Sequence, residues 1–168
     1  DWDWVMNINL QAVINSSRAF LSHLKQRPEA ALINTSSIFG MIVVERQSVY
    51  HTAKFAVRGF TESLAKEFKG SSVQIHCVHP GHIGTNILGN ARINKSEESA
   101  NAFQRLVGKL VGLNDDQEAM AEFFQKNGMH PSRAAQVMLN GVLRKRSRIL
   151  VGTDAKLMDL CQRLTPMH

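Results

Sequence analysis

Hydrophobic positions divide the chain into alternating helical and extended segments. Dense apolar positions without Gly or Pro predict a helix over 2–26, and a single apolar stripe predicts another over 48–69. The same kind of pattern predicts helices over 131–145 and about 154–163. Short apolar runs predict three buried strands, over 31–36, 73–78 and 148–151. Strands separated by helices of this length predict an α/β fold with a parallel sheet covered on both faces.

The predicted first strand and the segment 86–130 each need an explanation. The apolar pair Leu32-Ile33 would lie on an open sheet edge, which leads us to expect further strands upstream of this sequence. Residues 86–130 are polar, with helical patterns around 97–110 and 115–126, and long segments that follow a strand are often lids. We expect this segment to cover a substrate site. Its apolar residues would either line that site or simply pack: Leu88, Phe103, Leu106, Leu110, Met120, Phe123 and Phe124.

The composition is that of a soluble globular protein of one domain. The chain has 168 residues, of which 43% are hydrophobic and 20% charged. No apolar run approaches the roughly 20 residues that cross a bilayer, and no basic-then-apolar leader opens the chain. The two cysteines, Cys77 and Cys161, form no C-x-x-C pair, so we expect reduced, mostly buried thiols. These features predict a cytoplasmic protein without a membrane partner.

The net charge of +6 raises the question of a nucleic-acid partner. The basic residues are scattered, except for a cluster where a helix is predicted to end: Arg144, Lys145, Arg146 and Arg148. Cations at that position are favoured by the helix dipole, so a solvated helix end explains the cluster. The chain has one Tyr and no aromatic residues interleaved with the basic ones, and we therefore expect no nucleic-acid partner.

Three histidines, His76, His79 and His82, suggest a metal site at first sight. Their spacing runs from a predicted strand into the Pro80-Gly81 turn, and it cannot point all three rings at one ion without distortion. We therefore predict no metal site.

Tyr50 and Lys54 are the residues most suggestive of chemistry. Residues four apart on a helix share a face, about 5–6 Å apart at Cβ. An ammonium about 4 Å from a phenolate, at an effective dielectric of about 20, stabilises it by about 4 kcal/mol. That energy corresponds to roughly 3 pKa units, so we expect Lys54 to lower the pKa of Tyr50 from about 10 towards neutrality.

Taken alone, a Tyr-x-x-x-Lys pair often arises by chance. The context of Tyr50 and Lys54 strengthens the catalytic interpretation. Ser37 lies thirteen residues before Tyr50, at the end of a predicted buried strand. The next predicted strand ends at Pro80-Gly81. Functional groups of a parallel α/β sheet gather at the carboxyl ends of its strands, which here meet at one edge.

Three segments together resemble the short-chain dehydrogenase/reductase family. They are Asn34–Gly40, Tyr50-x-x-x-Lys54 and Pro80-Gly81-x-Ile83-x-Thr85, and Met6–Leu10 is similar to the family's upstream helix motif. The resemblance implies a Rossmann-like, doubly wound parallel sheet of which this chain supplies the later strands and helices. It also implies an oxidoreductase that uses NAD or NADP on a secondary alcohol or ketone. The family's assembly suggests a homodimer or homotetramer, with Phe20 and Phe60 as candidate interface residues.

The resemblance assigns four catalytic roles. Tyr50 would be the general acid–base, and Lys54 would lower its pKa and hold the ribose hydroxyls of the nicotinamide nucleotide. Ser37 would bind the substrate oxygen. Asn9 would support a water-mediated proton relay to Lys54, whereas the residue type alone favours a helix-interior Asn facing a polar cavity.

The same resemblance assigns the nicotinamide end of the cofactor site to Pro80, Gly81, Ile83 and Thr85. No glycine-rich phosphate loop occurs in the sequence, and the residue that separates NAD from NADP is absent with it. We expect that loop to lie in an upstream segment of a longer natural protein. The alternative is a catalytically silent interaction module on the same fold.

Overall fold

The computed structural model describes residues 1–87, 122 and 125–164 of the chain. The chain divides into two compact units, one of Asp1–Gly81 with Ala135–His168 and the other of His82–Ala134. The predicted lid over 86–130, with its helices around 97–110 and 115–126, lies mostly outside the described residues.

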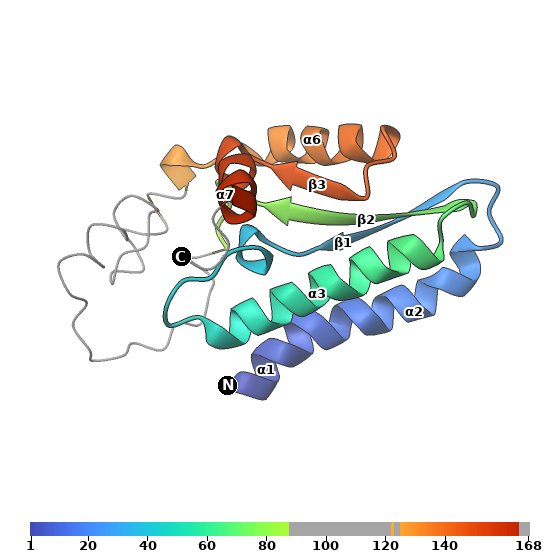
Figure 1. The fold of residues 1–168 in the computed structure, drawn as a ribbon, viewed down its shortest axis with the longest axis horizontal. Helices are drawn as coiled ribbons and strands as arrows, with labels where there is room; N and C mark the ends of the chain where they lie inside the picture. Colours follow the sequence, from blue (N-terminus) through green and yellow to red (C-terminus); the bar gives the residue numbers. More distant parts are fainter. Residues whose placement is uncertain (88–121, 123–124, 165–168) are drawn as a thin grey trace. The chain divides into compact units, whose positions relative to one another are not determined.

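A parallel three-stranded sheet in the order β1-β2-β3 is the centre of the first unit (Figure 1). Its strands are β1 (Ala30–Thr35), β2 (Val73–Pro80) and β3 (Arg148–Val151). Thr35 pairs with Val78 and Pro80 with Val151, so the three carboxyl ends meet at one edge. This confirms the predicted α/β parallel sheet.

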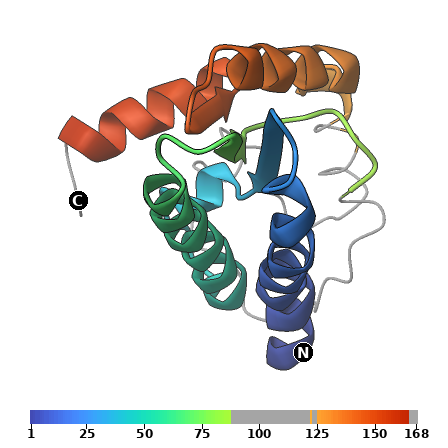
Figure 2. The ribbon, with the colours of Figure 1, turned by 90° about the vertical axis from the view of Figure 1, so that its right-hand side faces the viewer.

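Helices cover this sheet from two sides, as Figures 1 and 2 show. α2 (Ala12–Leu24) and α3 (Ser48–Glu67) lie on one side, and α6 (Pro131–Leu143) lies, from Ala135 onward, on the other. α6 approaches β3 closely, because a Cβ added at Gly141 would lie 2.7 Å from the Ile149 side chain. The last helix, α7 (Thr153–Leu164), follows β3 after the left-handed Gly152.

The predicted helix over 2–26 contains a change of pitch that its sequence does not reveal. It consists of α1 (Trp2–Met6), the π-helical turn η1 (Asn7–Gln11) and α2. Such turns arise where one extra residue is accommodated in a helix, frequently at functional sites. η1 contains Asn9, one of the predicted catalytic residues.

A buried polar network ties α2, β1 and α3 together. The Ser17 hydroxyl donates to the Asn34 amide oxygen at 3.2 Å, and the Asn34 amide nitrogen donates to the Thr61 hydroxyl at 3.1 Å. Thr61 in turn donates to the Val57 carbonyl at 2.7 Å. Apolar packing lies beside this network, where Leu64 meets Val73 and the other buried residues under the sheet.

β1 is one of the two edge strands of the described sheet, and its second face is open in the described part of the chain. Its alternate residues Ala31, Ile33 and Thr35 are exposed, Ile33 to 42%. Of the predicted apolar pair, Ile33 is therefore exposed, whereas Leu32 packs against the core under the sheet. The two cysteines are expected to be mostly buried. Cys77 is buried, and its burial raises the pKa of the thiol to about 12, whereas Cys161 is exposed. None of the helices described is both long and apolar enough to cross a membrane.

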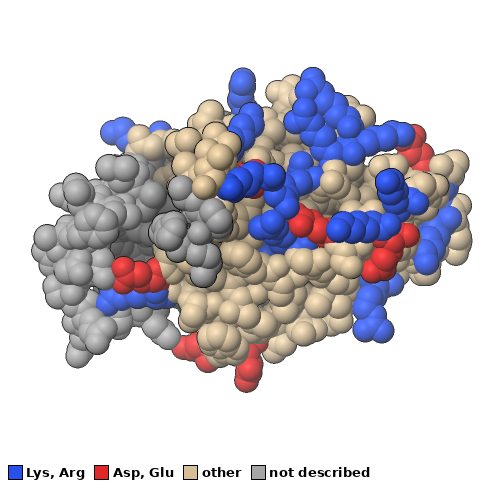
Figure 3. Space-filling view, in the orientation of Figure 1, with Lys and Arg blue, Asp and Glu red and all other residues tan. Residues whose placement is uncertain are grey.

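The basic cluster has two different environments. α6 ends before Arg144, and the left-handed backbone of Lys145 (φ 54°) turns the chain towards β3, as predicted for a helix end. Arg148 is different, because it lies in β3 and forms ion pairs with Glu62 of α3 and, at 3.3 Å, with Asp159 of α7. Figure 3 shows Lys and Arg side chains spread over one face, with acidic side chains among them.

Candidate active site

The candidate site forms where the carboxyl ends of β1 and β2 lie side by side. Ser36 directly follows β1, and its N–H donates to the Val78 carbonyl at 2.8 Å, which continues the ladder by one residue. Ser37 then caps the short 3-10 helix η2 (Ile38–Gly40), accepting the Phe39 N–H on its hydroxyl at 3.2 Å. Ser37 is thus held at the sheet edge, as its place in the sequence predicts.

Gly40 allows this turn to lie directly against α3. A Cβ at Gly40 would be 2.3 Å from the Ser36 hydroxyl and 2.7 Å from the Lys54 carbonyl, so no other residue fits without a shift. The same contact places the Ser36 hydroxyl 2.8 Å from the Lys54 carbonyl, to which it donates. Close packing at Gly40 therefore joins the segment that carries Ser37 to the helix that carries Tyr50 and Lys54.

Ser37, Tyr50 and Lys54 come together at this edge. The Ser37 side chain is hydrogen-bonded to Tyr50. Lys54 Nζ lies 5.5 Å from the centre of the Tyr50 ring and donates to the Thr35 carbonyl at 3.4 Å. The Phe39 ring packs edge-on against Tyr50, with centroids 6.3 Å apart.

Burial dominates the proton affinities of this pair. It raises the pKa of Tyr50, while the hydrogen bond from Ser37 acts in the opposite direction. Burial also lowers the pKa of Lys54. The structure thus differs from the expectation that Lys54 lowers the pKa of Tyr50. The reason is that desolvation disfavours both charged forms, and that the ammonium lies over the ring at 5.5 Å.

Asn9 lies on the π-helical turn that packs against the same part of α3. Leu10, the next residue, is buried against Ala53 and Val57 of α3. The Asn9 amide nitrogen donates to the Val5 carbonyl at 3.1 Å. The turn with Asn9 therefore contacts the stretch of α3 that carries Lys54.

The four predicted nicotinamide contacts fall into two groups. Pro80 ends β2, and the Gly81 N–H donates to the Val151 carbonyl at 2.8 Å. A Cβ at Gly81 would lie 2.2 Å from the Asp154 carboxyl group, so the approach of Asp154 is one structural reason for glycine there. Ile83 and Thr85 belong to the second unit, where the Thr85 N–H donates to the Ile83 carbonyl at 2.8 Å. The structure does not place these two relative to Tyr50.

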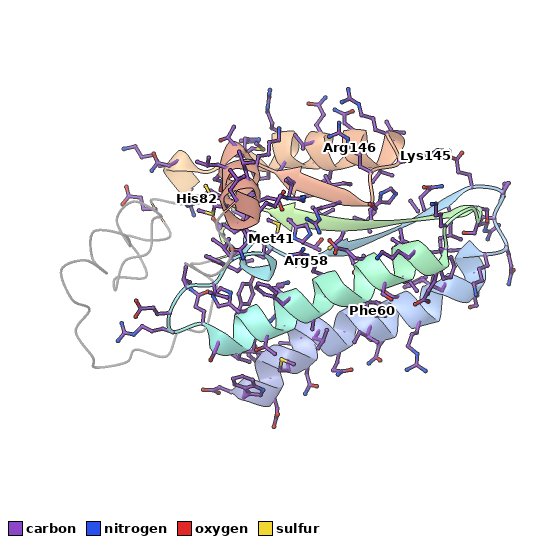
Figure 4. All side chains as sticks on the ribbon, in the orientation of Figure 1. Met41, Arg58, Phe60, His82, Lys145 and Arg146 are labelled. Atoms are coloured by element: carbon purple, nitrogen blue, oxygen red, sulfur yellow. The ribbon has the colours of Figure 1, made fainter. Side chains whose placement is uncertain are left out.

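Sequence reasoning missed the side chains that hold the η2 turn. The His51 ring, buried next to Tyr50, lies with Nδ1 3.0 Å from the Phe39 carbonyl and accepts the Val44 N–H on Nε2 at 3.0 Å. Arg58 donates to the Gly40 carbonyl at 3.3 Å, and Figure 4 shows its side chain beside this turn. Contacts from a side chain to a distant carbonyl leave no periodic signal that a sequence could reveal.

The donors at this edge fit the hydroxyl groups of a ribose. Lys54 has three N–H donors, of which the Thr35 carbonyl takes one. Within residues 1–87 and 125–164 there is no cluster of three or more His, Cys, Asp or Glu side chains that would bind a metal ion.

Comparison with known proteins identifies relatives of this chain. The profile of the short chain dehydrogenase family matches residues 1–96. SadH of Mycobacterium tuberculosis, named as an oxidoreductase, is 36% identical over 98% of this chain and 54% of its own length. A 3-ketodihydrosphingosine reductase of Bacteroides thetaiotaomicron is 30% identical over 83% of this chain and 49% of its own. The chain spans about half the length of these relatives.

Solved structures share the fold. A short chain dehydrogenase/reductase from Burkholderia phymatum, solved in complex with NAD, superposes with a TM-score of 0.73 at 21% identity. That comparison covers 98% of this chain and 58% of the other. A short chain dehydrogenase from Burkholderia cenocepacia, in complex with NADP, gives 0.67 at 18% identity over 94% of this chain and 54% of its own. At these identities the likeness concerns the fold alone.

Proposed function

Because the chain belongs to the short-chain dehydrogenase/reductase family of oxidoreductases, we propose that it supplies the catalytic residues of an NAD(P)-dependent enzyme acting on a secondary alcohol or ketone. The grouping of Ser37, Tyr50 and Lys54 at the carboxyl edge of the sheet carries this proposal. A nicotinamide cofactor bound at this edge would accept or donate the hydride.

Tyr50 exchanges a proton with the substrate oxygen, and Ser37 holds that oxygen by its hydroxyl. The hydrogen bond between Ser37 and Tyr50 supports this assignment, because one substrate oxygen can contact both hydroxyls. Lys54 lies beside the Tyr50 ring and offers its ammonium to ribose hydroxyls. Its charge, when present, favours the phenolate and therefore removal of the Tyr50 proton.

Asn9 serves a proton path towards Lys54. A π-helical turn interrupts the regular i→i−4 hydrogen bonds of a helix, which leaves a backbone carbonyl available to a water molecule. The turn η1 contains Asn9 and packs through Leu10 on the stretch of α3 that carries Lys54. We assign this segment to the relay that returns protons to solvent.

As cofactor we propose NAD or NADP, and the sequence pattern assigns Pro80, Gly81, Ile83 and Thr85 to its nicotinamide end. Structures of similar fold were solved with each of the two cofactors. The sequence contains no glycine-rich phosphate loop, which would supply backbone N–H groups and a helix N-terminus to the pyrophosphate. The isolated 168 residues should therefore bind either cofactor weakly.

The test combines turnover and binding. The natural protein, assayed with NAD(H) and NADP(H) on a panel of secondary alcohols and ketones, should oxidise or reduce at least one of them. Titration calorimetry should show binding of one cofactor to the natural protein and none at micromolar concentration to the 168 residues alone. Micromolar binding to the isolated chain would overturn the weak-binding expectation, and a natural protein without turnover would overturn the enzyme assignment.

A catalytically silent interaction module on the same fold is the alternative, and it is not favoured. A silent module has no need for Ser37, Tyr50 and Lys54 together, and this chain has all three at one edge. Cofactor binding by the natural protein without any turnover would favour this alternative.

We also propose that the natural protein forms a homodimer or homotetramer through α2 and α3. Phe20 of α2 is 60% exposed, while Phe60 of α3 is partly buried against the core and so offers less free surface. A second copy would cover Phe20. Sedimentation of the natural protein at micromolar concentration should show an oligomer that Phe20→Glu weakens, and a monomer would contradict the assembly.

A further inference from the structure

We propose that His79 is a positioning residue for Ser37, holding its main-chain carbonyl at the end of β1 so that its hydroxyl faces Tyr50. His79 lies in β2 directly before Pro80, and its side chain is fully buried. Its Nδ1 lies 3.0 Å from the Ser37 carbonyl oxygen. This inference rests on the function proposed above, because it concerns the residue assigned to the substrate oxygen.

The hydrogen on the His79 ring can be assigned from its surroundings. Burial lowers the pKa of His79, so the neutral ring with a single N–H is favoured. A carbonyl oxygen only accepts, and the hydrogen must therefore be on Nδ1. Nε2 is buried and has no hydrogen-bond partner in the described part of the chain. An unpaired buried nitrogen is unfavourable, which indicates that the ring is kept for its Nδ1 contact rather than for packing.

The contact from His79 holds the Ser37 carbonyl, which the two side chains of α3 near this turn do not contact. His51 holds the Phe39 carbonyl and Arg58 holds the Gly40 carbonyl, both from α3. Ser37 itself has an extended backbone (φ −165°, ψ 168°), and its carbonyl also accepts the Gly40 N–H at 3.0 Å. That second contact is local to the turn, so His79 is the side chain that ties Ser37 to the neighbouring strand.

His76 provides a matched control on the same strand. It is 1% exposed, its Nδ1 lies 2.7 Å from the Arg146 carbonyl, and its Nε2 also lacks a partner among the described residues. Three residues from His79, it points to the other face of the sheet. Arg146 lies in the turn before β3, at the end of the sheet opposite η2 (Figure 4). A substitution at His76 thus removes the same kind of contact without touching Ser37.

The experiment compares His79→Leu, His79→Asn and His76→Leu in the natural protein, with rates corrected for the folded fraction. His79→Leu should lower kcat roughly ten- to a hundredfold, since small misplacements of a reacting group have effects of that size. His79→Asn, whose amide can donate near the position of Nδ1, should recover part of the loss. His76→Leu should leave kcat nearly unchanged.

The pH dependence of the alcohol-oxidation rate adds a measurement that general destabilisation of the fold would not change. The Ser37 hydroxyl lowers the pKa of Tyr50, so a displaced Ser37 should shift the rise of alcohol oxidation to higher pH in His79→Leu. Equal kcat losses in His79→Leu and His76→Leu, with no shift of the profile, would overturn the proposal.

Magnetic resonance tests the contact without any turnover. In the ¹⁵N-labelled natural protein, the hydrogen of the His79 ring should be on Nδ1, and a hydrogen on Nε2 alone would overturn the proposal. The Ser37 resonances should change in His79→Leu, change less in His79→Asn, and stay nearly unchanged in His76→Leu. If the natural protein turns over no substrate, the proposed function fails, and these resonances still decide whether His79 positions Ser37.

Discussion

The two halves of α3 have different roles in this structure, although both belong to one continuous helix. In its first two turns, Tyr50 and Lys54 are only partly buried and face the polar end of the sheet. Further along, Leu64 is buried against Val73 and Ile75 of β2. The buried Thr61 accepts a hydrogen bond from Asn34 of β1. One apolar stripe runs through both halves, so the periodic pattern does not separate them. What separates them is the neighbouring strand, which ends beside the first half and continues over the second.

This comparison predicts that changes in the first half alter chemistry and changes in the second alter stability. Tyr50→Phe tests the first half and, together with Lys54→Ala, should give the largest effect. It should reduce turnover by about 10²–10⁴-fold, because it removes the proton donor and leaves the ring in place. Unfolding and cofactor affinity of the natural protein should change little.

Lys54→Ala is the companion variant at the same edge. It should be at least as harmful to turnover and should also weaken cofactor binding, which Tyr50→Phe should not. Steady-state rates and calorimetry on both variants check this. Retention of more than about a tenth of the activity in Tyr50→Phe, a far smaller loss than a general acid gives, would refute its role.

Leu64→Ala tests the second half of the helix. Leu64 is 8% exposed and packs on Val73 and Ile75, so its truncation should lower the free energy of unfolding by about 2–5 kcal/mol. Urea unfolding measures this loss. The rate per folded molecule should stay near wild type, and a large fall in kcat would show that the two halves are coupled.

Asn34→Ala tests the polar network that joins the second half of α3 to β1 and α2. It removes the partner of Ser17 and one partner of Thr61, both buried, and should cost about 1–3 kcal/mol. Ser17→Ala in the same background should then cost less than in the wild type. Additive losses in this double-mutant cycle would mean that the hydrogen bonds are not coupled.

The smallest shift that we expect to measure is in the titration of Tyr50 in Ser37→Ala, beside the loss of turnover that the role of Ser37 on the substrate oxygen implies. Burial already raises the pKa of Tyr50, and the Ser37 hydrogen bond, which favours the phenolate, opposes it. Removing that bond should raise the pKa further. Tyr50 is the single tyrosine of the 168 residues, so phenolate absorbance reports on it directly. A titration of Ser37→Ala at lower pH than wild type would contradict this hydrogen bond.

The sequence by itself determined most elements of this fold and part of its site. Apolar periodicity is a local property, and it predicted the helix over 48–69, found as Ser48–Glu67, and the strand over 148–151, found unchanged. The spacing of Tyr50 and Lys54 fixed their shared face for the same reason. The carboxyl ends of β1 and β2 met at one edge because parallel strands run in one direction.

Only the tertiary structure decided how these residues are held and charged. The pKa of Tyr50 depends on how much burial opposes the phenolate, which spacing along a helix does not reveal. The contact of His79 with Ser37 joins residues 42 positions apart, and Arg148 pairs with Glu62 86 positions away. Such contacts depend on the packing of whole elements, and no local pattern of side chains encodes them. The π-helical turn at Asn9 likewise lies within a run of residues that reads as an ordinary helix.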